Sequence, residues 1–250
     1  MSGTETRLVP EPETGPAAKP RPTAADFLAV NRGGGLFTET FDQRLGAVFA
    51  LAAYRLGLPP TALTAANLVI GVATSVAVVL TAGPVAAGHL PAWLVGVLAF
   101  LIWHVAYALD CADGQLARVA GTGSAAGARV DVLVDVAVQI SLVAAVGSVA
   151  VAQRPSTPVW LVAVFASSWM INLVTSVMAK EGTNESLVSS SSLPVRIVKL
   201  IRDYGAMLFL IGLVMAAWPA GMIWVMVLFA VVNCLFLAAS VAAAGRASLR

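Results

Sequence analysis

The sequence predicts an all-α membrane protein with six transmembrane helices and, before the first of them, an amphipathic helix at the membrane interface. Only 11% of the 250 residues are charged, and 59% are hydrophobic, with a mean hydropathy of +0.87. A soluble globular protein carries about 25% charged residues. Apolar segments of roughly the length that a helix needs to cross a bilayer lie at about 61–82, 91–109, 128–151, 158–179, 204–218 and 221–244.

The first 22 residues differ in composition from the rest of the chain. They are rich in Pro, Glu and Thr and contain no apolar run. Because such a segment cannot bury enough apolar surface to fold, we interpret residues 1–22 as a disordered tail. The tail also lacks a basic segment followed by an apolar one, so we expect no secretory signal peptide.

Residues 23–58 form a juxtamembrane segment ahead of the first span. From Phe41 to Leu58 apolar residues recur at helical spacing, but only ten residues separate Arg44 from Arg55. Ten residues are too few to cross a bilayer. The pattern predicts an amphipathic helix that lies in the membrane interface, with an ordinary helix packed beneath the bundle as the alternative.

One membrane domain accounts for the remaining residues, 59–250. Turn-forming stretches separate its six spans, and the fifth span is the shortest. If the N-terminus and the loop between the second and third spans share a side, 14 of the 15 basic residues lie on that side and only Arg154 lies on the other. By the positive-inside rule, both termini and this loop face the cytoplasm.

Four aspartates flank this loop, two on each side, at the ends of two otherwise apolar helices. On a helix, Asp110 and Asp113 lie about 60° apart and Asp131 and Asp135 about 40° apart, so each pair shares a face. A short stretch rich in Gly and Ser between the pairs lets the chain reverse as an antiparallel hairpin. All four carboxylates can then point into one space. An oxygen-only set with no nearby His favours Mg²⁺, Mn²⁺ or Ca²⁺ over Zn²⁺.

The spacing D-x2-D-G-x2-A-R-x8-G-x3-D-x3-D resembles the signature of the CDP-alcohol phosphotransferase family at all eight fixed positions. The matching residues are Asp110, Asp113, Gly114, Ala117, Arg118, Gly127, Asp131 and Asp135. The resemblance implies an enzyme of phospholipid biosynthesis that transfers a phosphatidyl group from a CDP-activated lipid to an alcohol and releases CMP. It also implies a homodimer, and we expect the active site at the cytoplasmic face of a bacterial cell membrane.

The resemblance also implies a role for each aspartate. Asp110, Asp113 and Asp131 resemble the family's metal ligands, for two ions that would be Mg²⁺ or Mn²⁺. Asp135 resembles the general base and is also among the expected metal ligands, near the second metal ion.

Other residues resemble the family's site for CDP. They are Asp113, Gly114, Ala117, Arg118 and Gly127 in the motif and Pro60 and Thr64 upstream of it. Gly114 and Ala117 would leave room for the nucleotide, and Arg118 would meet its diphosphate. Gly127 would allow a close approach between helices. Pro60 and Thr64 match the start of the family's first span less closely, because Thr61 stands where Asn is usual, and Thr64 can equally be a helix-start residue.

Basic residues after the fourth span are candidates for binding the acceptor: Lys180, Arg196, Lys199 and Arg202. They could hold a polyol phosphate such as inositol phosphate or glycerol phosphate, or they could contact anionic head groups. The inositol-phosphate branch of the family carries an Arg directly after the fourth aspartate, where this chain has Val136. It also carries an arginine-rich run after the fourth helix, where this chain has AKEGTNES.

Three other interpretations remain open from the sequence. The aspartates could belong to a divalent-cation carrier, although a transport path needs polar groups through the depth of the membrane. The chain could be a catalytically silent relative that acts as a scaffold. The acids could also pair with Arg118 and Arg129 in a structural hairpin, but two arginines cannot neutralise four aspartates. The partners that we expect are the CDP-activated lipid, the alcohol acceptor and membrane lipids, with no nucleic acid.

Overall fold

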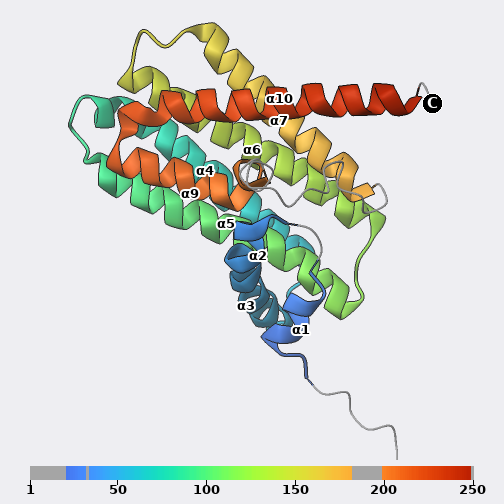
Figure 1. Ribbon diagram of the computed structural model, residues 1–250. Helices are drawn as coiled ribbons and strands as arrows, with labels where there is room; N and C mark the ends of the chain where they lie inside the picture. Colours follow the sequence, from blue (N-terminus) through green and yellow to red (C-terminus); the bar gives the residue numbers. More distant parts are fainter. Residues whose placement is uncertain (1–20, 32–33, 182–198, 249–250) are drawn as a thin grey trace, which may run out of the picture.

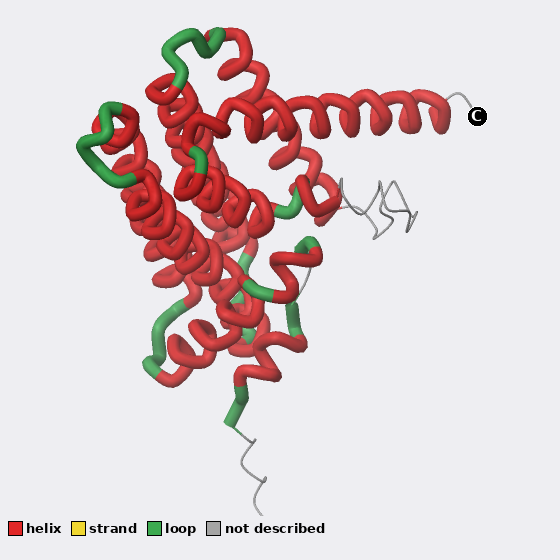
Figure 2. The backbone as a smooth tube through the Cα atoms, turned by 60° about the vertical axis from the view of Figure 1, so that its left-hand side comes forward, coloured by secondary structure: helices red, strands yellow, loops and turns green. Residues whose placement is uncertain are grey.

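The computed structural model describes residues 21–31, 34–181 and 199–248, and every secondary-structure element in these ranges is helical (Figure 1, Figure 2). The N-terminal helices are α1 (Ala24–Ala29), α2 (Leu36–Thr40) and α3 (Asp42–Arg55). The bundle helices are α4 (Pro60–Ala86), α5 (Ala92–Ala120), α6 (Ala125–Gln153), α7 (Val159–Glu181), α9 (Tyr204–Ala217) and α10 (Met222–Ser248), with the 3-10 turn η1 (Pro219–Gly221) before α10. The predicted disordered tail falls almost wholly outside the described residues.

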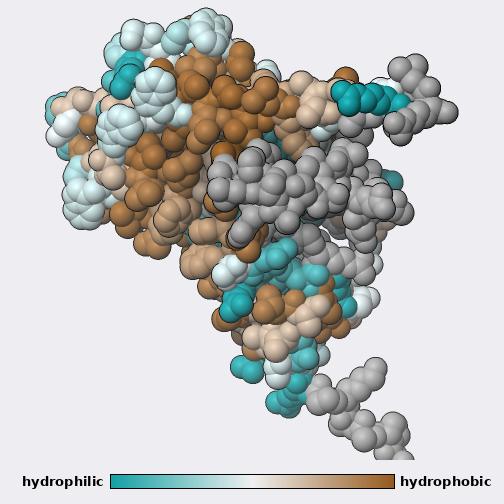
Figure 3. All heavy atoms as spheres, in the orientation of Figure 1, coloured by the Kyte–Doolittle hydropathy of each residue, from teal (hydrophilic) through white to brown (hydrophobic). Residues whose placement is uncertain are grey.

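Five helices of the described chain are long and apolar enough to cross a membrane, namely α4, α5, α6, α7 and α10 together with η1. Helix α9 is apolar as well but has only 14 residues, which extend about 21 Å at 1.5 Å per residue. Much of the bundle surface in view is apolar (Figure 3), as expected for contact with lipid. The all-α polytopic fold is therefore confirmed. The shortest predicted span, 204–218, corresponds to α9.

The turn between α5 and α6 determines where the aspartates lie. Helix α5 ends at Gly121, whose φ of +66° is a left-handed conformation that glycine adopts without strain. Helix α6 begins after Ser124, whose Oγ accepts a hydrogen bond of 3.0 Å from the Gly127 N–H. Both helices pack along α4. The aspartates thus lie within about three turns of this loop, on two helices that a third helix holds in place.

The three N-terminal helices lie at the end of the bundle that carries this turn (Figure 1). Helix α3 packs along α5, α1 packs on α3, and α2 contacts α9. The face of α3 toward α5 includes Gly46, where an added Cβ would lie only 2.9 Å from the Cys111 Cβ. The other face exposes Arg44, Val48 and Arg55. The predicted amphipathic helix is present and packs against the bundle, and its place in the membrane interface stays a prediction.

Two buried tryptophans, Trp103 and Trp169, donate hydrogen bonds to polar side chains inside the bundle core. The Trp103 Nε1 donates to the Ser75 Oγ at 3.1 Å, and the Trp169 Nε1 donates to the Gln139 Oε1 at 2.9 Å. The Trp169 ring also stacks on Phe229, with centroids 4.4 Å apart. Because buried donors without partners are costly, these bonds favour one arrangement of α4 to α10 beneath the aspartates.

Candidate active site

Three of the four motif aspartates converge between the end of α5 and the start of α6. One carboxylate oxygen from each of Asp110, Asp113 and Asp131 lies within 4.8 Å of the other two. Asp113 is buried, and the other two residues are half-buried. Carboxylates this close repel one another unless protons or a cation compensate their charge. The structure therefore brings the three predicted metal ligands together.

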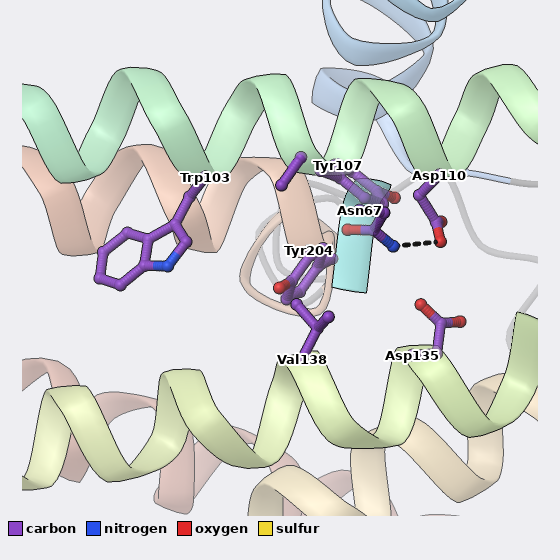
Figure 4. Close-up of a pocket in the computed structure, with 8 residues that line it drawn as sticks. Asn67, Trp103, Tyr107, Asp110, Asp135, Val138 and Tyr204 are labelled. Carbon is purple, nitrogen blue, oxygen red and sulfur yellow. Dashed lines mark hydrogen bonds between the residues drawn. The ribbon is translucent and has the colours of Figure 1, made fainter. Parts of the chain in front are cut away.

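Asp135, the predicted general base, lines a cavity opposite Asp110 (Figure 4). The other residues that line the cavity are Asn67, Trp103, Ala106, Tyr107, Val138 and Tyr204. The carboxyl groups of Asp110 and Asp135 face each other across the space between α5 and α6, with the rings of Tyr107 and Tyr204 beside them. Asp135 is thus separated from Asp110 on α5 by a small cavity.

Helix α4 contributes two hydrogen-bond donors to this centre. The Thr64 Oγ1 donates to the Asp113 Oδ2 at 2.5 Å, and the Asn67 Nδ2 donates to the Asp110 Oδ1 at 2.9 Å. The two donors lie three residues apart, so they share one face of α4. The helix starts after Pro59, which places Thr64 inside it rather than at its cap. Asn67 is a site residue that the sequence prediction missed, although a lone Asn three residues after Thr64 in an apolar helix was the available signal.

The residues predicted to bind CDP lie at the same end of the bundle. An added Cβ at Gly114 would lie 3.1 Å from the Arg118 Nη1, so the guanidinium group lies close against this glycine. Ala117 is half-buried and Arg118 is exposed. Pro60 is the first residue of α4, and its carbonyl oxygen lies 3.2 Å from the Thr64 Oγ1. CDP binding by these residues stays a prediction.

Gly127 does not make the close contact with another helix that we expected. Among the described residues, an added Cβ there would meet only the Ser124 Oγ, at 3.2 Å. Its amide lies against the hydroxyl that caps its own helix. The reason is positional, because Gly127 lies in the first turn of α6, before that helix meets its neighbours.

Two of the four basic residues predicted for the acceptor have described side chains. Lys199 is exposed, whereas Arg202 is half-buried. The Arg202 Nη2 donates to the Thr175 Oγ1 at 2.8 Å, and its guanidinium carbon lies 3.5 Å from the centroid of the Phe236 ring. Burial lowers the pKa of Arg202 to about 10, so the side chain is still charged at neutral pH. Arg196 and the side chain of Lys180 lie outside the described residues.

The aspartate cluster fits a hard divalent cation. Its ligand atoms are all carboxylate oxygens, the donor type that Mg²⁺ and Mn²⁺ prefer. Two of the carboxylates are oriented by donors from α4, as metal ligands commonly are by neighbouring side chains. His104 is not part of the cluster, because its Nδ1 lies 2.7 Å from a carboxylate oxygen of Asp42.

Fold and site together define a polytopic α-helical membrane protein with an acidic centre between two of its helices. The family model for CDP-alcohol phosphatidyltransferase matches residues 57–232, which is more than two thirds of the chain. The protein belongs to the CDP-alcohol phosphatidyltransferase family. A comparison with curated proteins gives no match. The matched region contains the four aspartates, Thr64 and Asn67, whereas α1 to α3 precede it.

Membership of this family makes the protein a relative of membrane transferases of phospholipid synthesis. Enzymes of the family take a CDP-alcohol and an alcohol acceptor as substrates and typically use divalent metal ions. The aspartate cluster is where such an ion would bind. This assignment favours a transferase over the divalent-cation carrier.

Proposed function

We propose that this protein transfers a phosphatidyl group from a CDP-activated lipid to the hydroxyl group of an alcohol acceptor. A bond forms between the acceptor oxygen and the lipid-bearing phosphorus, the bond from that phosphorus to CMP breaks, and CMP leaves. The observation that carries the proposal is the convergence of Asp110, Asp113 and Asp131 within 4.8 Å, in the region that the family model matches.

In this proposal Asp110, Asp113 and Asp131 hold the metal ions, two in number and either Mg²⁺ or Mn²⁺. The chemistry that bound divalent ions supply is compensation of the negative charge on the phosphate oxygens. Thr64 and Asn67 keep two of the carboxylates turned toward the site through their hydrogen bonds. Preoriented carboxylates lose less conformational freedom on binding than free ones do.

Asp135 is the proposed general base. Its carboxyl group lies across the cavity from Asp110, within a space that an acceptor hydroxyl could occupy. It would take the proton of the attacking hydroxyl as the new oxygen–phosphorus bond forms. Its position also allows a contact with the second metal ion.

The nucleotide half of the substrate would lie against the end of α5. Gly114 and Ala117 offer little side-chain bulk there, and Arg118 lies close to Gly114 with a guanidinium group suited to a diphosphate. Asp113, Gly127, Pro60 and Thr64 complete the proposed CDP site. This arrangement places the nucleotide outside the cavity that holds Asp135.

For the acceptor we propose a polyol phosphate, such as glycerol phosphate or inositol phosphate, held by the basic residues at the end of α7 and after it. Arg202 supports this best, since its described contacts are a hydroxyl group and an aromatic ring, both neutral. A half-buried cation of this kind favours an anionic ligand. Lys180, Arg196 and Lys199 are the other candidates, and contact with anionic head groups is the alternative role.

We further propose that the protein is a homodimer in a bacterial cell membrane, with both termini and the active site at the cytoplasmic face. The orientation is supported by the distribution of basic residues, of which 14 of 15 fall on the cytoplasmic side in this arrangement. Accessibility of single introduced cysteines in sealed vesicles, at the N-terminus and beside Arg154, tests the orientation.

The assay of the function uses purified protein with Mn²⁺ or Mg²⁺, CDP-diacylglycerol and a panel of alcohols that includes phosphorylated and unphosphorylated polyols. We expect CMP release with at least one acceptor. If the acceptor is phosphorylated, Arg202→Gln should raise its KM about tenfold, while Lys199→Gln changes it little. No CMP release across the panel, while a known family member is active alongside, would refute the function and leave a silent scaffold as the interpretation.

A further inference from the structure

A second group of buried polar side chains joins the N-terminal helices to the bundle. Thr38 and Asp42 come from α2 and α3, His104 and Tyr107 from α5, and Asp203 from the residue before α9. Thr38, Asp42, His104 and Asp203 are each at most 3% exposed. The first two lie before residue 57, where the family match begins. Neither the motif nor the proposed mechanism uses this group.

Asp203 caps two helices at once. Its Oδ1 accepts a hydrogen bond of 3.1 Å from the Gly205 N–H at the start of α9. Its Oδ2 accepts bonds from the N–H groups of Phe37 and Thr38 at the start of α2, at 2.8 and 3.1 Å. An added Cβ at Gly35 would lie 2.3 Å from this Oδ2, so the carboxylate reaches α2 only because residue 35 is glycine. Asp203 therefore holds the start of α2 against the start of α9.

Thr38 connects this carboxylate to Tyr107. The Thr38 Oγ1 donates a hydrogen bond to the Asp203 Oδ1, which can only accept. The one hydroxyl proton of Thr38 is used in that bond, so the Tyr107 hydroxyl, 3.3 Å from the Thr38 Oγ1, must donate to it. The bonds run in one direction, from Tyr107 through Thr38 to Asp203.

About one turn away, the Asp42–His104 pair joins α3 to α5. The two side chains are 2.7 Å apart, and the His104 ring lies among those of Phe37, Phe41 and Phe100. An added Cβ at Gly205 would lie 2.2 Å from the Asp42 Oδ2, so this carboxylate too approaches α9 closely. Burial raises the pKa of Asp42 above its usual value.

This group reaches the proposed site through two aromatic rings. Tyr107 packs edge-on against Tyr204, with ring centroids 4.7 Å apart, and both rings line the cavity that holds Asp110 and Asp135. Tyr204 directly follows Asp203 and is the first residue of the helix that Asp203 caps. The Tyr107 ring is thus held through its hydroxyl group, and the Tyr204 ring through the Asp203 cap of its helix.

We propose that Thr38 and Asp203 are positioning residues for the transfer reaction. They fix Tyr107 and Tyr204 as a rigid wall that directs the acceptor hydroxyl toward Asp135. The N-terminal helices, which lie outside the family match, are then part of the catalytic unit. This inference rests on the proposed function. Because the wall lies beside the cavity and the CDP site is proposed at the end of α5, loss of the wall should slow turnover more than it weakens binding of the CDP-lipid.

The test compares Thr38→Val, Thr38→Ser, Tyr107→Phe and the Thr38→Val/Tyr107→Phe double variant in the full-length enzyme. Thr38→Val keeps the volume and removes the hydroxyl group, and we expect kcat to fall roughly tenfold to a hundredfold. Thr38→Ser keeps the hydroxyl group and should retain most of the wild-type kcat. Tyr107→Phe should lower kcat as well, and the double variant should be little worse than Thr38→Val, since both substitutions break the same chain of bonds.

Thr40→Val is the matched control, because its hydroxyl group donates only to the Leu36 carbonyl oxygen of its own helix. It should leave kcat unchanged, and the KM for the CDP-lipid should stay within about twofold in every variant if positioning alone is lost. A Thr38→Val enzyme with wild-type kcat, or one in which kcat falls and Thr38→Ser fails to restore it, would overturn the positioning role while the proposed function stands. A wild-type protein that releases no CMP with any acceptor would refute the function, and the positioning role with it.

Discussion

Two groups of aspartates in this protein have opposite surroundings. Asp203 is 3% exposed, and its two oxygens accept hydrogen bonds from three backbone N–H groups and one hydroxyl group. Asp110, Asp113 and Asp131 instead turn carboxylate oxygens toward one another within 4.8 Å. The first carboxylate lies among hydrogen-bond donors, whereas the carboxylates of the second group lie beside one another and repel, so a bound cation or protons would stabilise them.

The comparison shows that burial alone does not identify a functional acid. Asp42 is fully buried and Asp113 is 6% exposed, yet they differ in kind. Asp42 faces the single ring of His104, while Asp113 faces two other carboxylates and a hydroxyl group that orients it. What distinguishes Asp113 from Asp42 here is that its neighbours include two other carboxylates.

The largest effect should come from Asp135→Asn. The amide has nearly the same shape but cannot accept the hydroxyl proton, so we expect kcat to fall by about 10²- to 10⁴-fold. Binding of CDP and of Mn²⁺ should be largely retained, which equilibrium binding on the purified variant measures. A loss of Mn²⁺ binding in this variant would make Asp135 a ligand rather than the base.

A smaller effect should follow from removing the donors on α4. Thr64→Val and Asn67→Ala leave all four aspartates in place but free two of their carboxylates to turn, so affinity for Mn²⁺ should fall roughly tenfold to a hundredfold. Thr81→Val is the control on the same helix, because the Thr81 hydroxyl donates only to carbonyl oxygens of α4. Equal affinities in Thr64→Val and Thr81→Val would show that α4 does not support the metal site.

An effect of similar size in free energy should distinguish the two groups of acids by stability. In metal-free protein, Asp203→Asn turns an amide donor toward backbone N–H groups and should cost about 1–3 kcal/mol of unfolding free energy. Asp131→Asn removes one of three mutually repelling charges, so it should leave the melting temperature unchanged or raise it. Thermal unfolding in detergent compares the two variants. A lower melting temperature for Asp131→Asn than for Asp203→Asn would contradict the distinction between the two groups of aspartates.

The fold and the aspartate cluster were largely predictable because both depend on local spacing. Each predicted apolar segment corresponds to a helix, and the hairpin follows from Gly121 and Ser124, which end one helix and begin the next. Helical periodicity then brings Asp110, Asp113 and Asp131 together, with Asp135 across the cavity from Asp110. Their side of the membrane and their ligands stay predictions.

The supporting contacts were not predictable, because they join residues far apart in the chain. Asn67 lies 43 residues from Asp110, and Asp42 lies 62 residues from His104. Thr38 and Asp203 are separated by 165 residues. A polar residue in or beside an apolar helix indicates that a partner exists, but only the packing of the helices shows which residue it is. For the same reason the close approach expected at Gly127 was wrong, since it depended on where α6 meets its neighbours.

The most direct test of the central claim is anomalous diffraction from crystals of the full-length protein grown with Mn²⁺. We predict an anomalous peak between the carboxylate oxygens of Asp110, Asp113 and Asp131, and the loss of that peak in Asp131→Asn crystals grown under the same conditions. Saturating Mn²⁺ with no peak at the three carboxylates, or an unchanged peak in the Asp131→Asn protein, would contradict a metal centre at this site.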